Sequence, residues 1–147
     1  MKETSLVVYV AGRYRDSTAW RIEENINMAK SITLQLLKAG HTPICPHTMY
    51  AHFDGECDDE VFLQAGLRLL HFCQAVVLVP GWEVSKGTQA EVSYARRLGL
   101  PICMGVDALD EVLNPRLPVE IQSALGQASA VPQQNEDSGE RSHVPYP

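Results

Sequence analysis

Two runs of the chain are apolar at successive positions instead of at alternating ones. The first extends from Leu6 to Ala11 and the second from Ala75 to Val79. A continuous apolar run of this length is typical of a strand that is buried on both faces of a parallel sheet. Gly12 ends the first run, and Pro80 and Gly81 end the second. We therefore predict that both runs are central strands.

Apolar residues recur at helical spacing after the first of these strands. They lie three or four positions apart, at Ile22, Ile26, Ala29, Ile32 and Leu36. An apolar stripe with this period, opposite a polar face, predicts a long amphipathic helix. Asp16, Ser17 or Thr18 is the expected N-cap, and Gly40 is the expected end.

A second helix is expected after the Gly-containing turn that follows the second strand. It carries apolar residues at helical spacing, at Val92, Ala95 and Leu98. Ser85 is a suitable N-cap, and Gly99 and Pro101 end the pattern. Glu91 therefore lies near the start of a helix, just beyond the carboxyl end of a central strand, where open α/β sheets bind ligands.

The remaining pattern predicts two outer strands and one more helix. The segment 41–45 is short and contains Pro43, which cannot donate a ladder hydrogen bond, so we place it at a sheet edge. The segment 101–105 is predicted to be a fourth strand. A helix capped by Asp58 or Asp59 carries a further apolar stripe, at Phe62, Ala65, Leu69 and Cys73.

Strands that alternate with helices predict an α/β fold with a parallel sheet and right-handed crossovers. We expect a doubly wound, flavodoxin- or Rossmann-like sheet of four to five strands in the order 2-1-3-4, with helices on both faces. The domain should span 1–126 and end in a short helix over 117–125. The polar composition of 127–147 predicts a disordered tail.

In this strand order the ligand crevice lies between the carboxyl ends of the two central strands. Three loops should converge there, at 12–16, 46–54 and 81–86. The order therefore predicts that residues far apart in sequence share one pocket, namely Arg13, Tyr14, Arg15, His47, Trp82, Ser85 and Glu91.

Composition narrows the range of partners. The net charge of −6 and the pI near 5.3 argue against a nucleic-acid polymer, whose binding needs clustered Lys and Arg. A small anionic ligand remains compatible with this charge. The sequence has no secretory signal pattern and no apolar run of membrane-spanning length, so we expect a cytoplasmic protein without a membrane partner. The cysteines should be reduced and buried.

Glu91 is the main candidate for chemistry. An ionised carboxylate can attack an electrophilic sugar carbon, as in retaining glycosidases, or act as a general base. Equally, Glu91 could be a surface residue of the helix beside its apolar stripe. Gly12 with Arg13 and Arg15 could bind an anion or form a solvated turn, and Trp82 could stack on a base or sugar or could pack in the core.

Motifs for other chemistries are absent from the sequence. Cys45, His47, His52 and Cys57 match no usual zinc spacing. The chain has no P-loop, no GxGxxG and no GxSxG motif. We therefore expect neither a metal nor another cofactor.

Three motifs in the right order resemble the nucleoside 2-deoxyribosyltransferase superfamily, over roughly residues 6 to 105. They are Tyr9-Val10-Ala11-Gly12, Pro46-His47 and Ser85-x-Gly87-Thr88-x-x-Glu91-x-x-Tyr94-Ala95. The likeness is greatest to a small, poorly characterised branch of that superfamily found in bacteria and phages.

The resemblance implies a homodimer or higher homo-oligomer that handles deoxynucleosides or their 5′-monophosphates. It implies that Glu91 attacks C1′ of the deoxyribose and that Tyr9 lies near this glutamate. Gly12 to Arg15 would line the sugar or phosphate side, and Ser85 and Gly87 would contact a 5′-phosphate.

Two positions depart from the family pattern. Cys73-Gln74 replaces a motif that usually contains aspartate, and Gly66 lies at about the place of another family aspartate. Gln74 could still bind substrate, but glutamine cannot transfer a proton at neutral pH. Asp54, Glu56 and His47 are the candidates to replace the missing acid.

The sequence therefore supports two main hypotheses about the function. The first is a deoxyribosyl transferase or hydrolase with Glu91 as nucleophile, and Arg13 and Arg15 favour a phosphorylated substrate. The alternative is a nucleotide-binding or sensor module that has lost turnover. An interaction protein acting through its tail is a weaker third reading.

Overall fold

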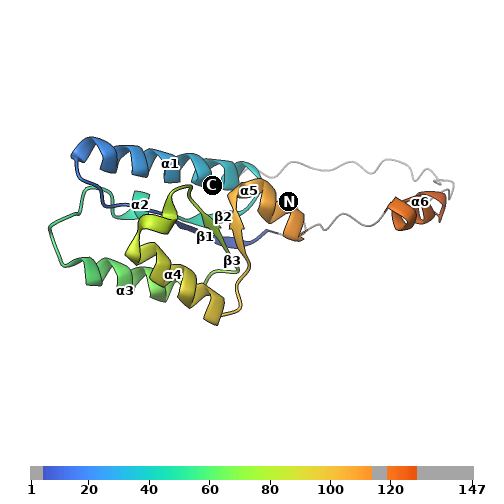
Figure 1. The fold of residues 1–147 in the computed structure, drawn as a ribbon. Helices are drawn as coiled ribbons and strands as arrows, with labels where there is room; N and C mark the ends of the chain where they lie inside the picture. The colour runs from blue at the N-terminus through green and yellow to red at the C-terminus, as the bar shows by residue number, and fades with distance from the viewer. Residues whose placement is uncertain (1–4, 114–118, 129–147) are drawn as a thin grey trace, which may run out of the picture. The chain divides into compact units, whose positions relative to one another are not determined.

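The computed structural model describes residues 5–113 and 119–128. Its four strands are β1 (Val7–Ala11), β2 (Thr42–Ile44), β3 (Ala75–Leu78) and β4 (Ile102–Met104). All are parallel, and the order β2-β1-β3-β4 confirms the predicted doubly wound α/β fold (Figure 1). Pro43 lies in β2, at the edge of the sheet as predicted.

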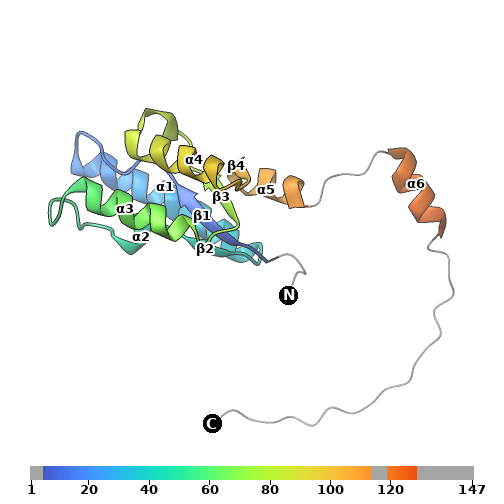
Figure 2. The same ribbon diagram turned by 90° about the horizontal axis from the view of Figure 1, so that it is seen from below.

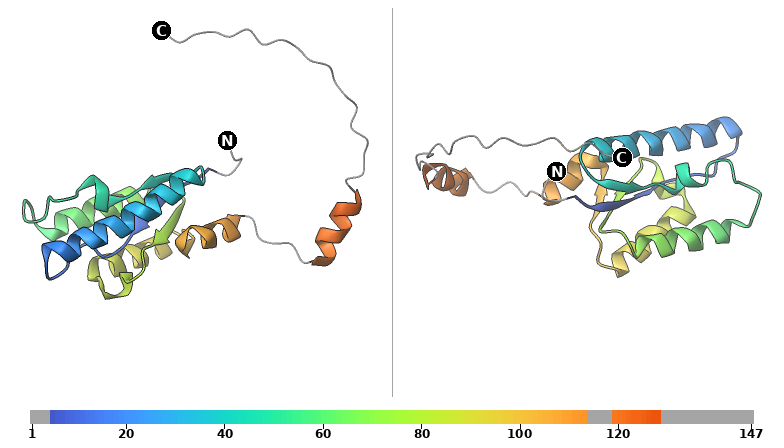
Figure 3. Two further views of the ribbon diagram at one scale, coloured as in Figure 1. Left: turned by 90° about the horizontal axis from the view of Figure 1, so that it is seen from above. Right: turned by 180° about the vertical axis from the view of Figure 1, so that it is seen from behind.

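One face of the sheet packs against α1 (Ala19–Lys38) and α5 (Gly105–Leu113). The blue helix α1 lies in front of the strands in the left view of Figure 3. Alternate residues of β1 and β3 point to this face, including Val8, Val10 and Val77. They form one buried cluster with Leu36 of α1 and Leu109 of α5. The two-residue alternation along each strand therefore assigns these side chains to one layer.

The other face packs against α3 (Asp59–Leu70) and α4 (Lys86–Arg97), seen from below in Figure 2. The intervening strand residues form a second cluster with these helices, and it consists of Tyr9, Ala11, Leu70, Cys73, Val76, Leu78, Val92 and Ala95. Each central strand is thus buried on both faces, which explains the continuous apolar runs.

Side-chain caps determine where two of the helices begin. Thr18 Oγ1 accepts a hydrogen bond from Arg21 N at 3.2 Å, and Ser85 Oγ accepts one from Thr88 N at 3.2 Å. Both caps were among the predicted ones. Asp58 is the N-cap of α3, although its side chain makes no capping hydrogen bond.

Several elements differ from the sequence predictions. The short helices α2 (Pro46–Met49) and η1 (Trp82–Val84) lie in segments predicted as loops, and α5 was not predicted. In α5, Val106 and Leu109 are buried at a spacing of three, which is the signal that the sequence prediction missed. Within the described ranges no fifth strand occurs.

The chain divides into two compact units, residues 1–115 and 116–147. The second unit contains α6 (Val119–Ala128), close to the predicted last helix. The predicted tail lies, from residue 129 onward, outside the described residues. Among the helices of the described ranges, none is long and apolar enough to cross a membrane.

Candidate active site

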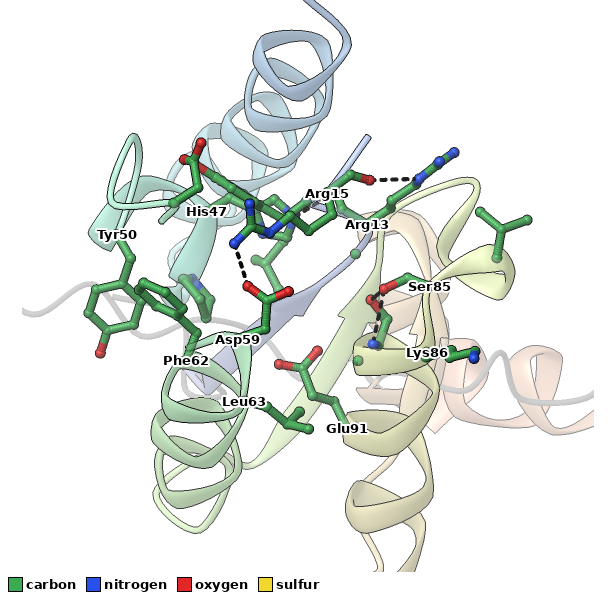
Figure 4. A pocket seen from close by; sticks show the side chains of 18 of the residues that line it. Arg13, Arg15, His47, Tyr50, Asp59, Phe62, Leu63, Ser85, Lys86 and Glu91 are labelled. Carbon is green, nitrogen blue, oxygen red and sulfur yellow. Dashed lines mark hydrogen bonds and ion pairs between the residues drawn. The ribbon is translucent and has the colours of Figure 1, made fainter. Parts of the chain in front are cut away.

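A cavity of about 480 Å³ opens at the carboxyl ends of β1 and β3 (Figure 4). It lies where the strand order reverses, and its size is typical of small-molecule sites. The three loops predicted to converge all contribute to its walls. The residues lining it are Val10, Gly12, Arg13, Tyr14, Arg15, Pro46, His47, Tyr50, Asp54, Asp59, Glu60, Phe62, Leu63, Val84, Ser85, Lys86, Gly87, Thr88 and Glu91.

The side chain of Glu91 points into this cavity from α4 (Figure 4). Its Oε1 accepts a 2.6 Å hydrogen bond from the Tyr9 hydroxyl, which projects from the fully buried middle of β1. Burial raises the pKa of Glu91 to about 7, although the Tyr9 hydrogen bond and the charge of His47 act in the opposite direction. Burial and the neighbouring carboxylate also raise the pKa of Tyr9. Tyr9 is therefore a neutral hydrogen-bond donor to a carboxyl group that titrates near neutrality.

Gly66 of α3 makes room for this pair. A Cβ at position 66 would lie 2.5 Å from the Tyr9 hydroxyl oxygen and 2.9 Å from Glu91 Oε1. Because both distances are shorter than a normal contact, any larger residue would displace the pair. In this chain the Tyr9 hydroxyl thus lies where a side chain at position 66 would project.

Three consecutive residues after β1 are tethered to the segment that follows β2. The Arg13 carbonyl oxygen lies 3.0 Å from His47 Nε2, and the Tyr14 hydroxyl donates to Asp54 Oδ1 at 2.6 Å. Arg15 forms an ion pair with Asp59 of α3. These contacts hold the two loops together over one side of the cavity.

The contact with the Arg13 carbonyl requires a proton on Nε2 of His47. Burial lowers the pKa of this imidazole, but contacts with Cys45 and with the Arg13 carbonyl raise it more, so the net shift is upward. His47 Nε2 is therefore occupied in holding the Arg13 loop. Asp54, another candidate acid, has a lowered pKa because Tyr14 donates to its carboxylate.

The opposite wall is the start of α4, contributed by Ser85, Lys86 and Gly87. The first-turn N–H groups of a helix carry positive partial charge and attract anions. The Arg13 guanidinium contacts the Arg15 carbonyl at 3.0 Å and Asp16 at 3.4 Å, and Figure 4 marks the first of these contacts. For Lys86, no ion pair is found in the described part of the chain.

Six of the seven residues predicted to share the pocket line it, and Trp82 does not. Trp82 is half-buried and packs against the buried cluster on the α3–α4 face of the sheet, which is the packing role that the sequence left open. The prediction that Gln74 binds substrate also needs correction, because this residue does not line the cavity. Its Oε1 accepts from Val7 N at 3.0 Å, at the amino ends of the strands, opposite the cavity.

Gly12 lines the cavity, but close packing explains why this residue is a glycine. A Cβ there would lie 2.6 Å from Cβ of Val79, so glycine allows the two strand ends to approach.

Of the cysteines, Cys57 is exposed and not buried as predicted, and all four are free thiols.

Sequence reasoning missed one wall of the cavity, formed by Tyr50, Phe62 and Leu63 together with Asp59. The signal was present, because residues three and four positions beyond Asp59 lie on the same helix face.

The described residues contain no group of three or more His, Cys, Asp or Glu side chains that could hold a metal ion.

Comparison with known proteins gives one family match. The family model described as "Domain of unknown function (DUF7768)" matches residues 6–104, which include all four strands and Glu91. No curated protein matches the chain. A solved structure of a 2-deoxyribosyltransferase from the psychrotolerant bacterium Bacillus psychrosaccharolyticus is similar, with a TM-score of 0.48 and 15% identity over 65% of this chain and 69% of that chain.

Proposed function

The chain belongs to the family described as Domain of unknown function (DUF7768), and we propose that it cleaves the N-glycosidic bond of deoxynucleosides or deoxynucleoside 5′-monophosphates. The observation that carries the proposal is the 2.6 Å hydrogen bond from Tyr9 to Glu91, whose side chain lines the cavity. A partly buried carboxylate that is held by one fixed donor at a cavity wall is suited to attack on a sugar carbon.

In the proposed reaction, a carboxylate oxygen of Glu91 forms a bond to C1′ while the bond between C1′ and the base nitrogen breaks. The electron pair of that bond leaves with the base, which takes up a proton from solvent water, and the water or second base that later attacks C1′ gives one back. Water or a second base then attacks C1′ and releases the Glu91 carboxylate, which completes hydrolysis or transfer. Tyr9 keeps the attacking carboxylate in one orientation throughout.

A 5′-phosphate would bind at the start of α4. Ser85 and Gly87 line this wall, and Lys86 adds a cation there. Arg13 and Arg15, which the sequence favours for this role, are paired with Asp16 and Asp59. The anion site is therefore proposed on the helix N-terminus and Lys86, with Arg13 and Arg15 maintaining the loop.

The direct test is base release from each of the four deoxynucleoside monophosphates, measured by chromatography with wild-type protein and with Glu91→Gln. We expect wild type to release base and the variant to lose at least about a hundredfold in rate, because the amide is not a nucleophile. The wild-type rate should rise with pH through about 7, as Glu91 ionises. Unchanged release by Glu91→Gln would remove the nucleophile assignment.

A nucleotide-binding module without turnover is the second candidate. It is favoured by one observation, that Asp54 and Asp59, the two aspartates lining the cavity, are already engaged by Tyr14 and Arg15. Neither is a free acid that could protonate a departing base. Saturable binding of a deoxynucleotide by wild type, without any free base, would support this candidate.

A further inference from the structure

The ion pair between Arg15 and Asp59 lies on the wall of the cavity opposite the start of α4, and both residues line the cavity (Figure 4). It joins the loop after β1 to the first turn of α3. Both side chains remain substantially accessible, with 50% of Arg15 and 70% of Asp59 exposed. The pair is therefore available to a ligand in the cavity.

Only part of the hydrogen-bonding capacity of this pair is used. Arg15 donates through one terminal nitrogen to Asp59 Oδ1, and no further partner of the Asp59 carboxylate is found within the described ranges. Each carboxylate oxygen can accept two hydrogen bonds, and a guanidinium has five N–H donors. Both carboxylate oxygens can therefore still accept, and Arg15 can still donate.

Arginine–carboxylate pairs are commonly coplanar. If Arg15 and Asp59 are held in one plane, they present one donor followed by two acceptors. This is the order of groups on the pairing edge of cytosine. The complementary order, one acceptor followed by two donors, is found on guanine, at O6, N1–H and the 2-amino group. Thymine presents acceptor, donor, acceptor, and adenine presents a donor beside an acceptor.

The neighbouring side chains provide a surface for a flat ring. Phe62 and Leu63 follow Asp59 on the same face of α3 and line the cavity, and the Tyr50 ring lies 6.1 Å from that of Phe62. Aromatic and apolar side chains that stack on a base, with polar groups at its edge, are the usual means of reading a single nucleobase. Glu91 lies between this wall and the start of α4, as attack on C1′ requires (Figure 4).

We propose that the Arg15–Asp59 pair is the specificity element of the cavity and that it selects guanine as the base of the substrate. Asp59 accepts from N1–H and the 2-amino group, and Arg15 donates to O6. The inference rests on the proposed function, because it requires a deoxynucleotide in this cavity, and it adds the identity of the base.

The test is a binding series with the Glu91→Gln variant, which removes turnover. Titration calorimetry would compare the 5′-monophosphates of deoxyguanosine, deoxyinosine, deoxyadenosine, deoxycytidine and thymidine. We expect deoxyguanosine monophosphate to bind about tenfold or more tightly than the other four, since a well-formed bidentate contact to a base discriminates by this much or more. Deoxyinosine monophosphate, which lacks only the 2-amino group, isolates the second acceptor of Asp59.

Asp59→Asn, made in the same background, should reduce the preference for guanine to less than about threefold, because the amide replaces one acceptor with a donor. The matched control is Asp58→Asn, a neighbouring aspartate that does not line the cavity and should keep the preference. If Asp59→Asn does not fold, Arg15→Gln tests the same pair from the other side and should also lose the preference.

Binding of all five nucleotides within about threefold of one another, or a guanine preference that survives Asp59→Asn and Arg15→Gln, would overturn the inference. Its failure can be separated from failure of the proposed function. Equal base release from all four deoxynucleoside monophosphates would keep the enzyme and remove the guanine reading. Selective guanine binding by wild type without base release would keep the guanine preference and remove the proposed enzymatic activity.

Discussion

Glu91 depends on two residues that are far from it in sequence. Tyr9 donates to its carboxylate, and Gly66 leaves the space in which this hydrogen bond forms. The three residues come from β1, α3 and α4. The properties of the candidate nucleophile are therefore set by contacts among three elements.

Tyr9→Phe should shift the acidic limb of the pH–rate profile for base release to higher pH. The hydrogen bond from Tyr9 lowers the pKa of Glu91, so its loss should raise that pKa above about 7. A hydrogen bond to a charged group corresponds to a shift of about one pH unit or more. The control is Tyr94→Phe, because Tyr94 bonds to His71 and does not line the cavity. An unshifted limb in Tyr9→Phe would contradict the proposed role of the hydrogen bond.

Gly66→Ala should lower the rate of base release by about tenfold or more, because a 1 Å displacement of reacting groups can cost a hundredfold. The added methyl group would lie too close to both the Tyr9 hydroxyl and Glu91 Oε1. Stopped assays at saturating substrate measure the effect. Gln64→Ala, on the exposed side of the same helix, should retain wild-type rates. Full activity in Gly66→Ala would show that the pair tolerates displacement.

At the scale of the elements, two helix caps with the same chemistry have different surroundings. Thr18 caps α1 away from the cavity, whereas Ser85 caps α4 at its wall. Ser85 Oγ also contacts Thr88 Oγ1 at 2.9 Å. A comparison of the two therefore separates the structural role of a cap from a role in ligand binding.

Thr18→Ala and Ser85→Ala should each lower the free energy of unfolding by about 1 kcal/mol, the usual cost of losing an N-cap. Denaturant titration measures this loss. Of the two, Ser85→Ala alone should weaken the binding of a deoxynucleoside 5′-monophosphate, since Ser85 lines the proposed phosphate site. Equal affinities in the two variants would place the phosphate elsewhere.

For the whole domain, Glu91 links stability to pH. Its pKa in the folded protein is raised from 4.5 to about 7, so the folded state holds a proton that the unfolded chain releases earlier. Stability should therefore fall as pH rises through this window, and the loss should be complete above about 7.

Glu91→Gln should remove this dependence. Above pH 7 the variant should be more stable than wild type, by up to about 3 kcal/mol, and the difference should disappear below the ordinary pKa of a glutamate. Thermal unfolding between pH 4 and 9 measures it, with Glu83→Gln as a control at an exposed glutamate of η1. Parallel stability curves for wild type and Glu91→Gln would show that the carboxylate is not desolvated.

The sequence by itself determined the strands, their order, and the meeting of three loops. Continuous apolar runs, caps such as Ser85 and the edge proline Pro43 are local signals, and parallel strands with short connections leave few topologies. Only the tertiary structure decided what each loop residue does. Trp82 packs against the edge of a buried cluster, Gln74 lies at the far end of the strands, and Asp59 pairs with Arg15 at the cavity. Side-chain direction and the close contacts around Gly66 depend on residues distant in sequence, and local patterns carry no information about them.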